Sequence, residues 1–288
     1  MFRRISVLLL ALAFASSARG AETVPISLIK TSRWEVNYDK EACHLLSKFG
    51  TGKQATIVRL TRYAPSSSFD LTLFGELFAT REAVRKIEVD FGLGHAIKRD
   101  ALAGTIGNKL PMLLLGSTRI DGLEPTDTQQ LVPRITPEQE ASATAISFKL
   151  LGGKRYRLES GSLAPPLAAL RKCVDDLVTT WGFDPAQQAA LQEPAVPLTS
   201  PSFWLQGEDY PAGSLYWGEN GVVTFRLTVA ANGSLESCHI LYRTKPDKVA
   251  DLTCKLRAKH ARFHPAIDAQ GNKIRSFYIN SVRWLARK

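Results

Sequence analysis

The chain lacks the sequence motifs around which most well-characterised active sites are built. It contains no GxSxG nucleophile elbow, no phosphate-binding P-loop, no HExxH zinc motif and no glycine-rich dinucleotide fingerprint. It also has no CxxC pair, which argues against a redox or zinc-binding function. These absences predict a protein that is not an enzyme and that holds no cofactor.

One histidine pair has the spacing of a zinc site. His260 and His264 lie four residues apart, which would place both imidazoles on one face of a helix. Pro265 directly follows His264 and disfavours helical geometry there. We therefore expect no metal site.

Long apolar runs are also scarce, and the longest lies at the amino terminus. Arg3 and Arg4 precede an apolar run over 5–15, and small residues then lead to Gly20. This order is typical of a secretory signal peptide, with cleavage predicted after Gly20. A membrane-spanning helix needs about 20 apolar residues. The alternative is that residues 1–20 are retained as a membrane anchor.

Cysteine is rare but present in an even number. An exported chain with four cysteines is expected to form disulfides, and three connectivities are open. The spacing favours Cys43–Cys173 in the first half and Cys238–Cys254 in the second.

The positive charge is placed unevenly. Residues 21–210 carry 21 basic and 22 acidic side chains, whereas residues 211–288 carry 13 basic and 5 acidic ones. The excess suits an anionic partner surface, or it forms a solvated face that keeps the protein dissolved.

The first domain, residues 21–183, is predicted to be α+β, with an antiparallel sheet followed by a long helix at its carboxy-terminal end. A short helix is expected to carry Cys43. Alternating sequence patterns indicate strands at 34–38, 55–60, 69–74, 86–91, 111–115, 145–151 and 155–159. Apolar residues at helical spacing predict the long helix over 163–181: Leu167, Leu170, Val174, Leu177, Val178 and Trp181.

A proline-rich linker is predicted at 184–207. It contains four prolines and little apolar pattern. It separates the first domain from a second, small domain at 208–288.

The second domain begins with a predicted hairpin. Residues 221–229 and 235–242 alternate, and Asn232-Gly233 stands between them. A two-residue turn there needs φ above zero at both central positions, which these two residues tolerate. It pairs Val223 with Tyr242, Phe225 with Ile240 and Leu227 with Cys238 on one face. The other face receives mostly polar residues: Thr224, Arg226, Thr228, Ser237 and His239.

A helix ending near Ala261 and a closing strand over 274–284 complete this predicted β-β-α-β domain. Val249, Leu252, Leu256 and Phe263 form the main apolar stripe of the helix. Cys254 lies about 140° around the helix from Val249. A Cys238–Cys254 bridge therefore requires two buried sides, which we expect.

Several ordered motifs of the second domain carry a resemblance. They are Asp209-Tyr210-Pro211, the strand 221–229, Gly233, and Ala261-Arg262-Phe263-His264-Pro265-Ala266. Together they resemble the TonB carboxy-terminal domain family. The resemblance covers about residues 208–288, just over a quarter of the chain.

The resemblance implies a non-enzymatic periplasmic protein that binds a protein partner in the cell envelope, such as an outer-membrane receptor, and not a nucleic acid. Members of the family hold an extended peptide as an added strand. The corresponding edge here is 273–284, which implies these partner-binding residues: Tyr210, Pro211, Ile274, Ser276, Tyr278 and Asn280.

Two alternatives stay open. A membrane-anchored energy transducer for outer-membrane transport would resemble the family more fully. Its members have an amino-terminal membrane helix that bears a histidine, whereas the first histidine here is His44. An envelope hydrolase would use titratable groups of the first domain. The oligomeric state is not indicated by the sequence.

Overall fold

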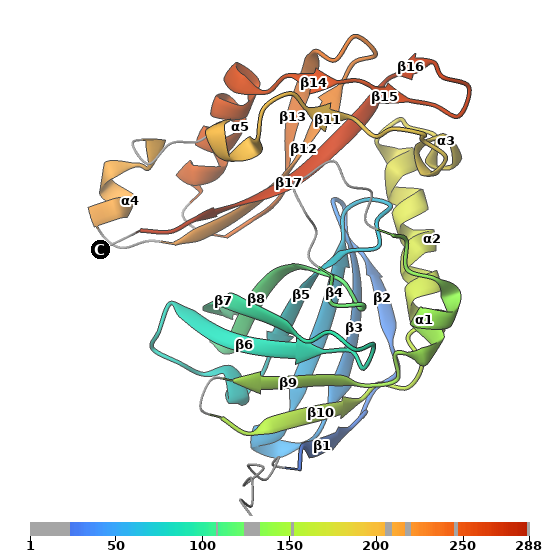
Figure 1. Cartoon of the computed structure of the whole chain (residues 1–288). Helices are drawn as coiled ribbons and strands as arrows, with labels where there is room; N and C mark the ends of the chain where they lie inside the picture. The colour runs from blue at the N-terminus through green and yellow to red at the C-terminus, as the bar shows by residue number, and fades with distance from the viewer. Residues whose placement is uncertain are drawn as a thin grey trace, which may run out of the picture.

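The computed structural model describes residues 24–107, 109–123, 133–150, 153–204, 209–216, 220–244 and 247–286. The predicted signal peptide and its cleavage position lie outside these residues. The described residues form three hydrophobic clusters, one in the amino-terminal part and two in the carboxy-terminal part. Figure 1 shows the carboxy-terminal part above a large curled sheet, with helix α2 along one side.

The amino-terminal part is built on one ten-stranded sheet, ordered β1-β10-β9-β6-β7-β8-β5-β4-β3-β2. Its strands are β1 (Ile26–Ile29), β2 (Glu35–Tyr38), β3 (Cys43–Phe49), β4 (Thr56–Arg62), β5 (Phe69–Phe74), β6 (Val84–Asp90), β7 (Ile97–Ile106), β8 (Leu110–Thr118), β9 (Ile146–Leu150) and β10 (Arg155–Glu159). Among the described strand pairs, that of β1 and β10 alone is parallel. A bridge between Lys30 and Phe49 joins the end of β1 to β3, so the sheet curls until its two margins approach each other.

The α+β prediction is wrong, because the chain is mostly β and its main sheet is mixed. The described α-helices are α1 (Pro137–Ser142), α2 (Ala164–Thr180), α3 (Pro185–Ala189), α4 (Ala212–Tyr216) and α5 (Lys248–His260), and short 3-10 turns lie at Gly52–Gln54, Glu76–Phe78 and Pro201–Trp204, the last named η3. Only α2 and α5 exceed six residues. Strand β7 was missed because its run of Lys98, Arg99 and Asp100 masks the alternation of a strand.

The helix expected around Cys43 is also wrong, since Cys43 begins strand β3. Cys43, Leu45, Ser47 and Phe49 are buried, while His44, Leu46 and Lys48 are more exposed. This two-residue period belongs to a strand. The adjacent pair Leu45-Leu46 obscures it in the sequence.

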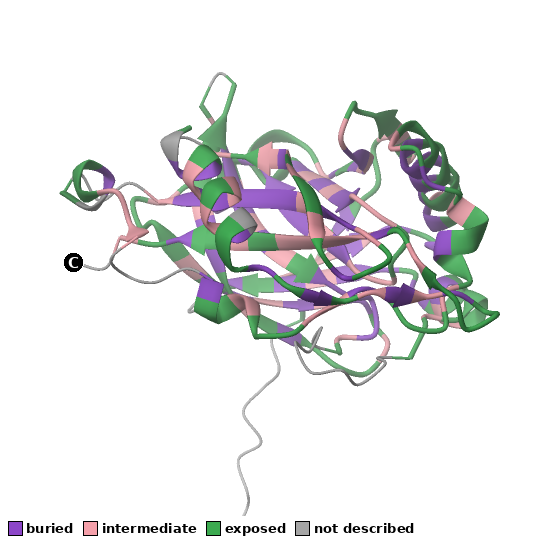
Figure 2. Ribbon diagram, turned by 90° about the horizontal axis from the view of Figure 1, so that it is seen from above, coloured by how far each residue is buried: buried purple, intermediate pink, exposed green. Residues whose placement is uncertain are grey.

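Helix α2 packs the large sheet with the apolar stripe that the sequence predicts. Leu167, Leu170 and Val174 are buried, and Figure 2 shows the helix buried toward the sheet and exposed on its outer side. The predicted disulfide Cys43–Cys173 is confirmed and ties α2 to β3. It closes a loop of 130 residues, which restricts the unfolded chain strongly.

The carboxy-terminal part contains a three-stranded antiparallel sheet ordered β13-β12-β17. Its strands are β12 (Gly221–Val229), β13 (Leu235–Arg243) and β17 (Ser276–Trp284). Two short pairs join β11 (Val196–Pro197) to β14 (Phe263–His264) and β15 (Ala266–Ile267) to β16 (Lys273–Ile274). Helix α5 buries Val249, Ala250, Thr253 and Arg257 along one side, so the second buried side that we expected is not found. The predicted Cys238–Cys254 disulfide is confirmed.

The segment predicted as a linker lies against this core. Trp204, at the end of η3, is 2% exposed, and its indole ring meets Phe263 and Tyr278 edge-on. Ala195 is buried in the same cluster. Burial of large aromatic and apolar surface stabilises the carboxy-terminal sheet.

The hairpin register is largely confirmed, but its turn differs from the prediction. Phe225 pairs with Ile240 and Leu227 with Cys238, whereas Val223 pairs with Arg243 and not with Tyr242. An irregularity between Thr224 and Phe225 causes that one-residue shift.

Residues 230–234 connect the two strands of the hairpin, and a hydrogen bond between Ala230 and Ser234 closes a three-residue loop, 231–233. The Ala230 amide donates to the Ser234 carbonyl, and only Gly233 has a positive φ. This geometry is a type I turn followed by a left-handed residue. A second irregularity, between Thr228 and Val229, offsets the one-residue shift that this turn introduces. Phe225 and Leu227 therefore pair as predicted.

Gly233 offers a test of this turn. It has φ +84°, and an added Cβ would lie 2.2 Å from the Phe263 carbonyl oxygen. Gly271 has the same φ, but nothing lies within 4 Å of its Cβ position. We expect Gly271→Ala to cost about 1–2 kcal/mol of unfolding free energy, from the left-handed backbone alone. Gly233→Ala must cost clearly more, because β14 has to move.

Denaturant unfolding of the two variants measures this difference. Equal losses of stability would show that the contact between the turn and β14 does not constrain the hairpin.

Candidate functional site

The first candidate is the outer edge of β17. This nine-residue strand pairs with β12 along its whole length, from Ser276 opposite Val229 to Trp284 opposite Gly221. Among the described residues it pairs with no second strand. An unpaired edge presents backbone donors and acceptors that an extended polypeptide can satisfy.

The direction of the backbone groups on β17 follows from the hydrogen bonds of β12. The Thr244 amide donates to the Val222 carbonyl, and the Ala230 amide donates to the Ser234 carbonyl, so even-numbered residues of β12 face β13. In an antiparallel sheet this direction alternates. Odd-numbered residues of β12 therefore face β17 and pair with its even-numbered residues.

The free edge of β17 is thus formed by the backbone of its odd-numbered residues: Phe277, Ile279, Ser281 and Arg283. In agreement, the Ser281 amide donates to the side-chain oxygen of Asn280 and not to a ladder partner. These residues were not among the partner-binding residues predicted from the sequence. The sequence 276–284 alternates with a period of two, as a strand does. Which of its residues turn their backbone groups outward follows only once the edge of the sheet is known.

The residues predicted to contact a partner on β17 point their side chains into the core. Ser276 is buried and donates to Gln188 Oε1 at 2.6 Å. The Tyr278 ring packs against Phe263 at 5.4 Å between centroids. Asn280 donates to the Tyr278 hydroxyl at 2.8 Å. The backbones of Ser276, Tyr278 and Asn280 face β12.

The remaining predicted residues lie at opposite ends of this strand. The Tyr210 ring meets Trp284 at 5.4 Å, at the end of β17, and Pro211 follows directly before α4. Ile274 lies in β16 and pairs with Ala266. The six residues therefore follow the length of the strand and do not gather at one point.

The polar face of the three-stranded sheet rests on the amino-terminal part. The Arg283 guanidinium donates to the carbonyls of Asp100, at 2.7 Å, and Leu115. The Tyr63 and Thr224 side chains hydrogen-bond across the contact. Thr224 is buried and also contacts the Ser281 hydroxyl at 2.7 Å. The face is polar because its partners are polar main-chain and side-chain groups.

Asp70 of β5 lies in this contact. Burial raises the pKa of its carboxyl to about 6, against the opposing positive charges of Arg283 and Arg59. Burial also raises the pKa of the Tyr63 phenol, and the neighbouring Asp70 adds to the rise. The contact therefore holds a carboxyl whose neutral form is favoured by its surroundings.

A second candidate is a cleft of about 500 Å³ between the two parts of the chain. The Arg226 guanidinium lies 4.1 Å from the Trp181 ring centroid. Arg226 Nε and Nη1 and the Trp181 indole N–H have no acceptor among the described residues. Burial lowers the pKa of Arg226, while the negative charge of Glu41 opposes this.

Two carboxylates that line the cleft, Glu41 and Asp39, each contact a histidine. His239 contacts Glu41 at 3.0 Å, and His44 contacts Asp39 at 3.5 Å and Thr61 at 2.9 Å. Burial lowers the pKa of His44, Arg59 lowers it further, and Asp39 raises it. Because Glu41 and His239 come from different parts, this pair helps to hold the parts together.

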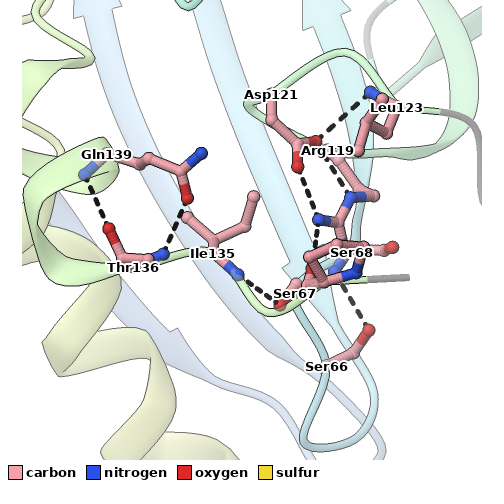
Figure 3. A network of polar contacts seen from close by, with 10 residues as sticks. Ser66, Ser67, Ser68, Arg119, Asp121, Leu123, Ile135, Thr136 and Gln139 are labelled. Carbon is pink, nitrogen blue, oxygen red and sulfur yellow. Dashed lines mark hydrogen bonds and ion pairs between the residues drawn. The ribbon is translucent and has the colours of Figure 1, made fainter. Parts of the chain in front are cut away.

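A third polar cluster surrounds Arg119 and is drawn in Figure 3. Its guanidinium donates to Asp121 at 2.9 Å and to the Pro133 carbonyl at 2.6 Å, and Asp121 accepts the Leu123 amide. Arg119 is 4% exposed. Its contacts fix the chain after β8, so we assign this cluster a structural role.

Comparison with protein-family models, curated proteins and solved structures gave no match. In the part of the chain that the structure describes, no group of three or more histidine, cysteine or acidic side chains is arranged to hold a metal ion. No helix within the described ranges combines the length and apolar character needed to cross a membrane. The two disulfides fit an exported protein.

Asp70→Asn tests the buried contact. The folded pKa of about 6 exceeds the unfolded value of 3.8, so Asp70 contributes stability fully below pH 4. That contribution is lost as the pH rises through 6. The variant should match the wild type near pH 4 and be more stable at pH 7, by up to roughly 3 kcal/mol for a two-unit shift.

Urea unfolding between pH 4 and 7 checks this expectation. Glu35→Gln, on the exposed surface of β2, serves as the control and should leave the pH dependence unchanged. Parallel stability curves for wild type and Asp70→Asn would contradict the assignment.

Proposed function

We propose that this protein is a periplasmic, non-enzymatic binding protein whose β17 edge receives an extended segment of a cell-envelope protein partner. The observation that supports this most directly is the free edge, with outward backbone groups at Phe277, Ile279, Ser281 and Arg283. The resemblance of 208–288 to the TonB carboxy-terminal domain family agrees with strand addition at this position. The two disulfides agree with an oxidising compartment.

The surroundings of β17 favour a defined register for an added strand. The strand is held on one face by the Tyr278, Phe263 and Trp204 rings. On the other face Phe277 packs against Trp181 at 5.5 Å and Phe183 at 5.1 Å. Because β17 is packed on both faces, its backbone is already ordered and loses little conformational entropy when a peptide binds.

Ile279 provides the decisive variant. Its amide points to the free edge, so Ile279→Pro removes one outward donor and leaves the ladder to β12 intact. Ile279→Ala shortens the same side chain but keeps the amide. The partner binds chiefly through main-chain hydrogen bonds in strand addition.

A library of displayed peptides is selected against the full chain with both disulfides formed, and an enriched peptide is titrated by fluorescence anisotropy. We expect Ile279→Pro to weaken binding about tenfold, because the peptide loses one main-chain hydrogen bond and the adjacent bonds are disturbed. Ile279→Ala should bind nearly as the wild type does. Failure to enrich any peptide, or equal affinity for the proline variant, would refute strand addition here.

A further inference from the structure

A second surface, distinct from the β17 edge, lies around the carboxy-terminal end of α5. Residues 252–266 and 195–204 contain no aspartate or glutamate. We define the α5 surface by six exposed residues: Leu198, Phe203, Lys255, Lys259, Arg262 and His264. Lys255, Lys259 and Arg262 form no ion pair with a described residue, so their charge is unbalanced.

The pairing of β11 with β14 places apolar and basic side chains side by side. Val196 pairs with His264, and the Leu198 amide donates to the Arg262 carbonyl at 2.8 Å. Residues opposite each other in a pair project to the same side, so Leu198 and Arg262 share the outer face. Phe263, between Arg262 and His264, turns inward and is 4% exposed.

Helix α5 and η3 extend this face. Lys255 and Lys259 lie four residues apart and share one side of the helix. The buried Arg257 donates to the Pro201 carbonyl at 2.8 Å and so holds η3 against α5. In η3, Phe203 is 70% exposed. Leu198, before η3, is 52% exposed.

Exposed apolar side chains among unbalanced cations match the chemistry of a lipid surface. Cations are attracted to anionic headgroups, and exposed apolar side chains enter the boundary between headgroups and acyl chains. An acidic polypeptide would neutralise the cations but would leave Leu198 and Phe203 in water. An exported chain meets membrane surfaces and not nucleic acid.

We propose that the α5 surface docks on a bilayer that contains anionic phospholipid. The cations of Lys255, Lys259 and Arg262 lie at the level of the phosphates. Leu198 and Phe203 insert between the headgroups. This inference does not depend on peptide binding at β17, since it uses other residues and another ligand.

Cosedimentation of the full chain with vesicles tests the proposal. Vesicles of phosphatidylglycerol and phosphatidylcholine are compared with vesicles of phosphatidylcholine alone. All variants carry the same amino terminus, so any contribution of residues 1–20 is shared. We expect binding to the anionic vesicles that weakens with added salt. No preference for phosphatidylglycerol would overturn the proposal.

Two double variants separate the contributions. Lys255→Glu with Lys259→Glu should weaken vesicle binding by about tenfold or more. Leu198→Ser with Phe203→Ser should also weaken it, and this loss should persist at high salt because it is not electrostatic. All substituted side chains are exposed, and thermal unfolding together with a thiol count verifies that the fold and disulfides are kept.

The matched control is Lys53→Glu with Lys98→Glu, two exposed lysines of the amino-terminal part. It makes the same change in net charge and should bind as the wild type does. An equal loss in this control would show that only net charge matters and would overturn the proposal. If the protein binds soluble polyglutamate and this binding also depends on Leu198 and Phe203, the ligand is an acidic polypeptide and the bilayer proposal is overturned.

Discussion

The arrangement of this protein depends on a polar contact between two sheets. The Arg283 guanidinium of β17 reaches the main-chain carbonyls of Asp100 and Leu115 on the large sheet. Around it, Thr224 is buried and Asp70 is half-buried. A carboxylate withdrawn from water is costly unless its charge and hydrogen bonds are compensated. The two parts of the chain are therefore held in one orientation, and β17 is held with them.

This constraint decides which parts of the carboxy-terminal sheet remain available. One face is filled by α5 and the Trp204 segment, and the other face lies on the amino-terminal part. The backbone edges of β17 and β13 are left, together with the outer side of α5 and β14. The edges offer hydrogen bonds, and the outer side of α5 and β14 offers charge and apolar surface. The two proposed ligands, an extended polypeptide and an anionic bilayer, would therefore not compete for the same atoms.

Sequence reasoning succeeded where one local signal was strong. The pairing of Phe225 with Ile240 and both disulfides were predicted correctly. It failed for the fold class, because ten strands, several of them short or charged, build one curled sheet. Strands depend on partners distant in the sequence, so β7 and the Cys43 strand lack a decisive local pattern. The chosen partner-binding side chains, such as Tyr278, belong to the core, and the outward groups are backbone.

The sequence alone determined the hairpin strands, the apolar stripe of α2 and the uneven charge of the carboxy-terminal part, because each is written in neighbouring residues. Only the tertiary structure decided that the polar side of the hairpin is buried. It also decided that β17 has a free edge, and that Leu198 lies beside Arg262. These are relations between residues far apart along the chain. Their energies arise only when folding brings the partners together.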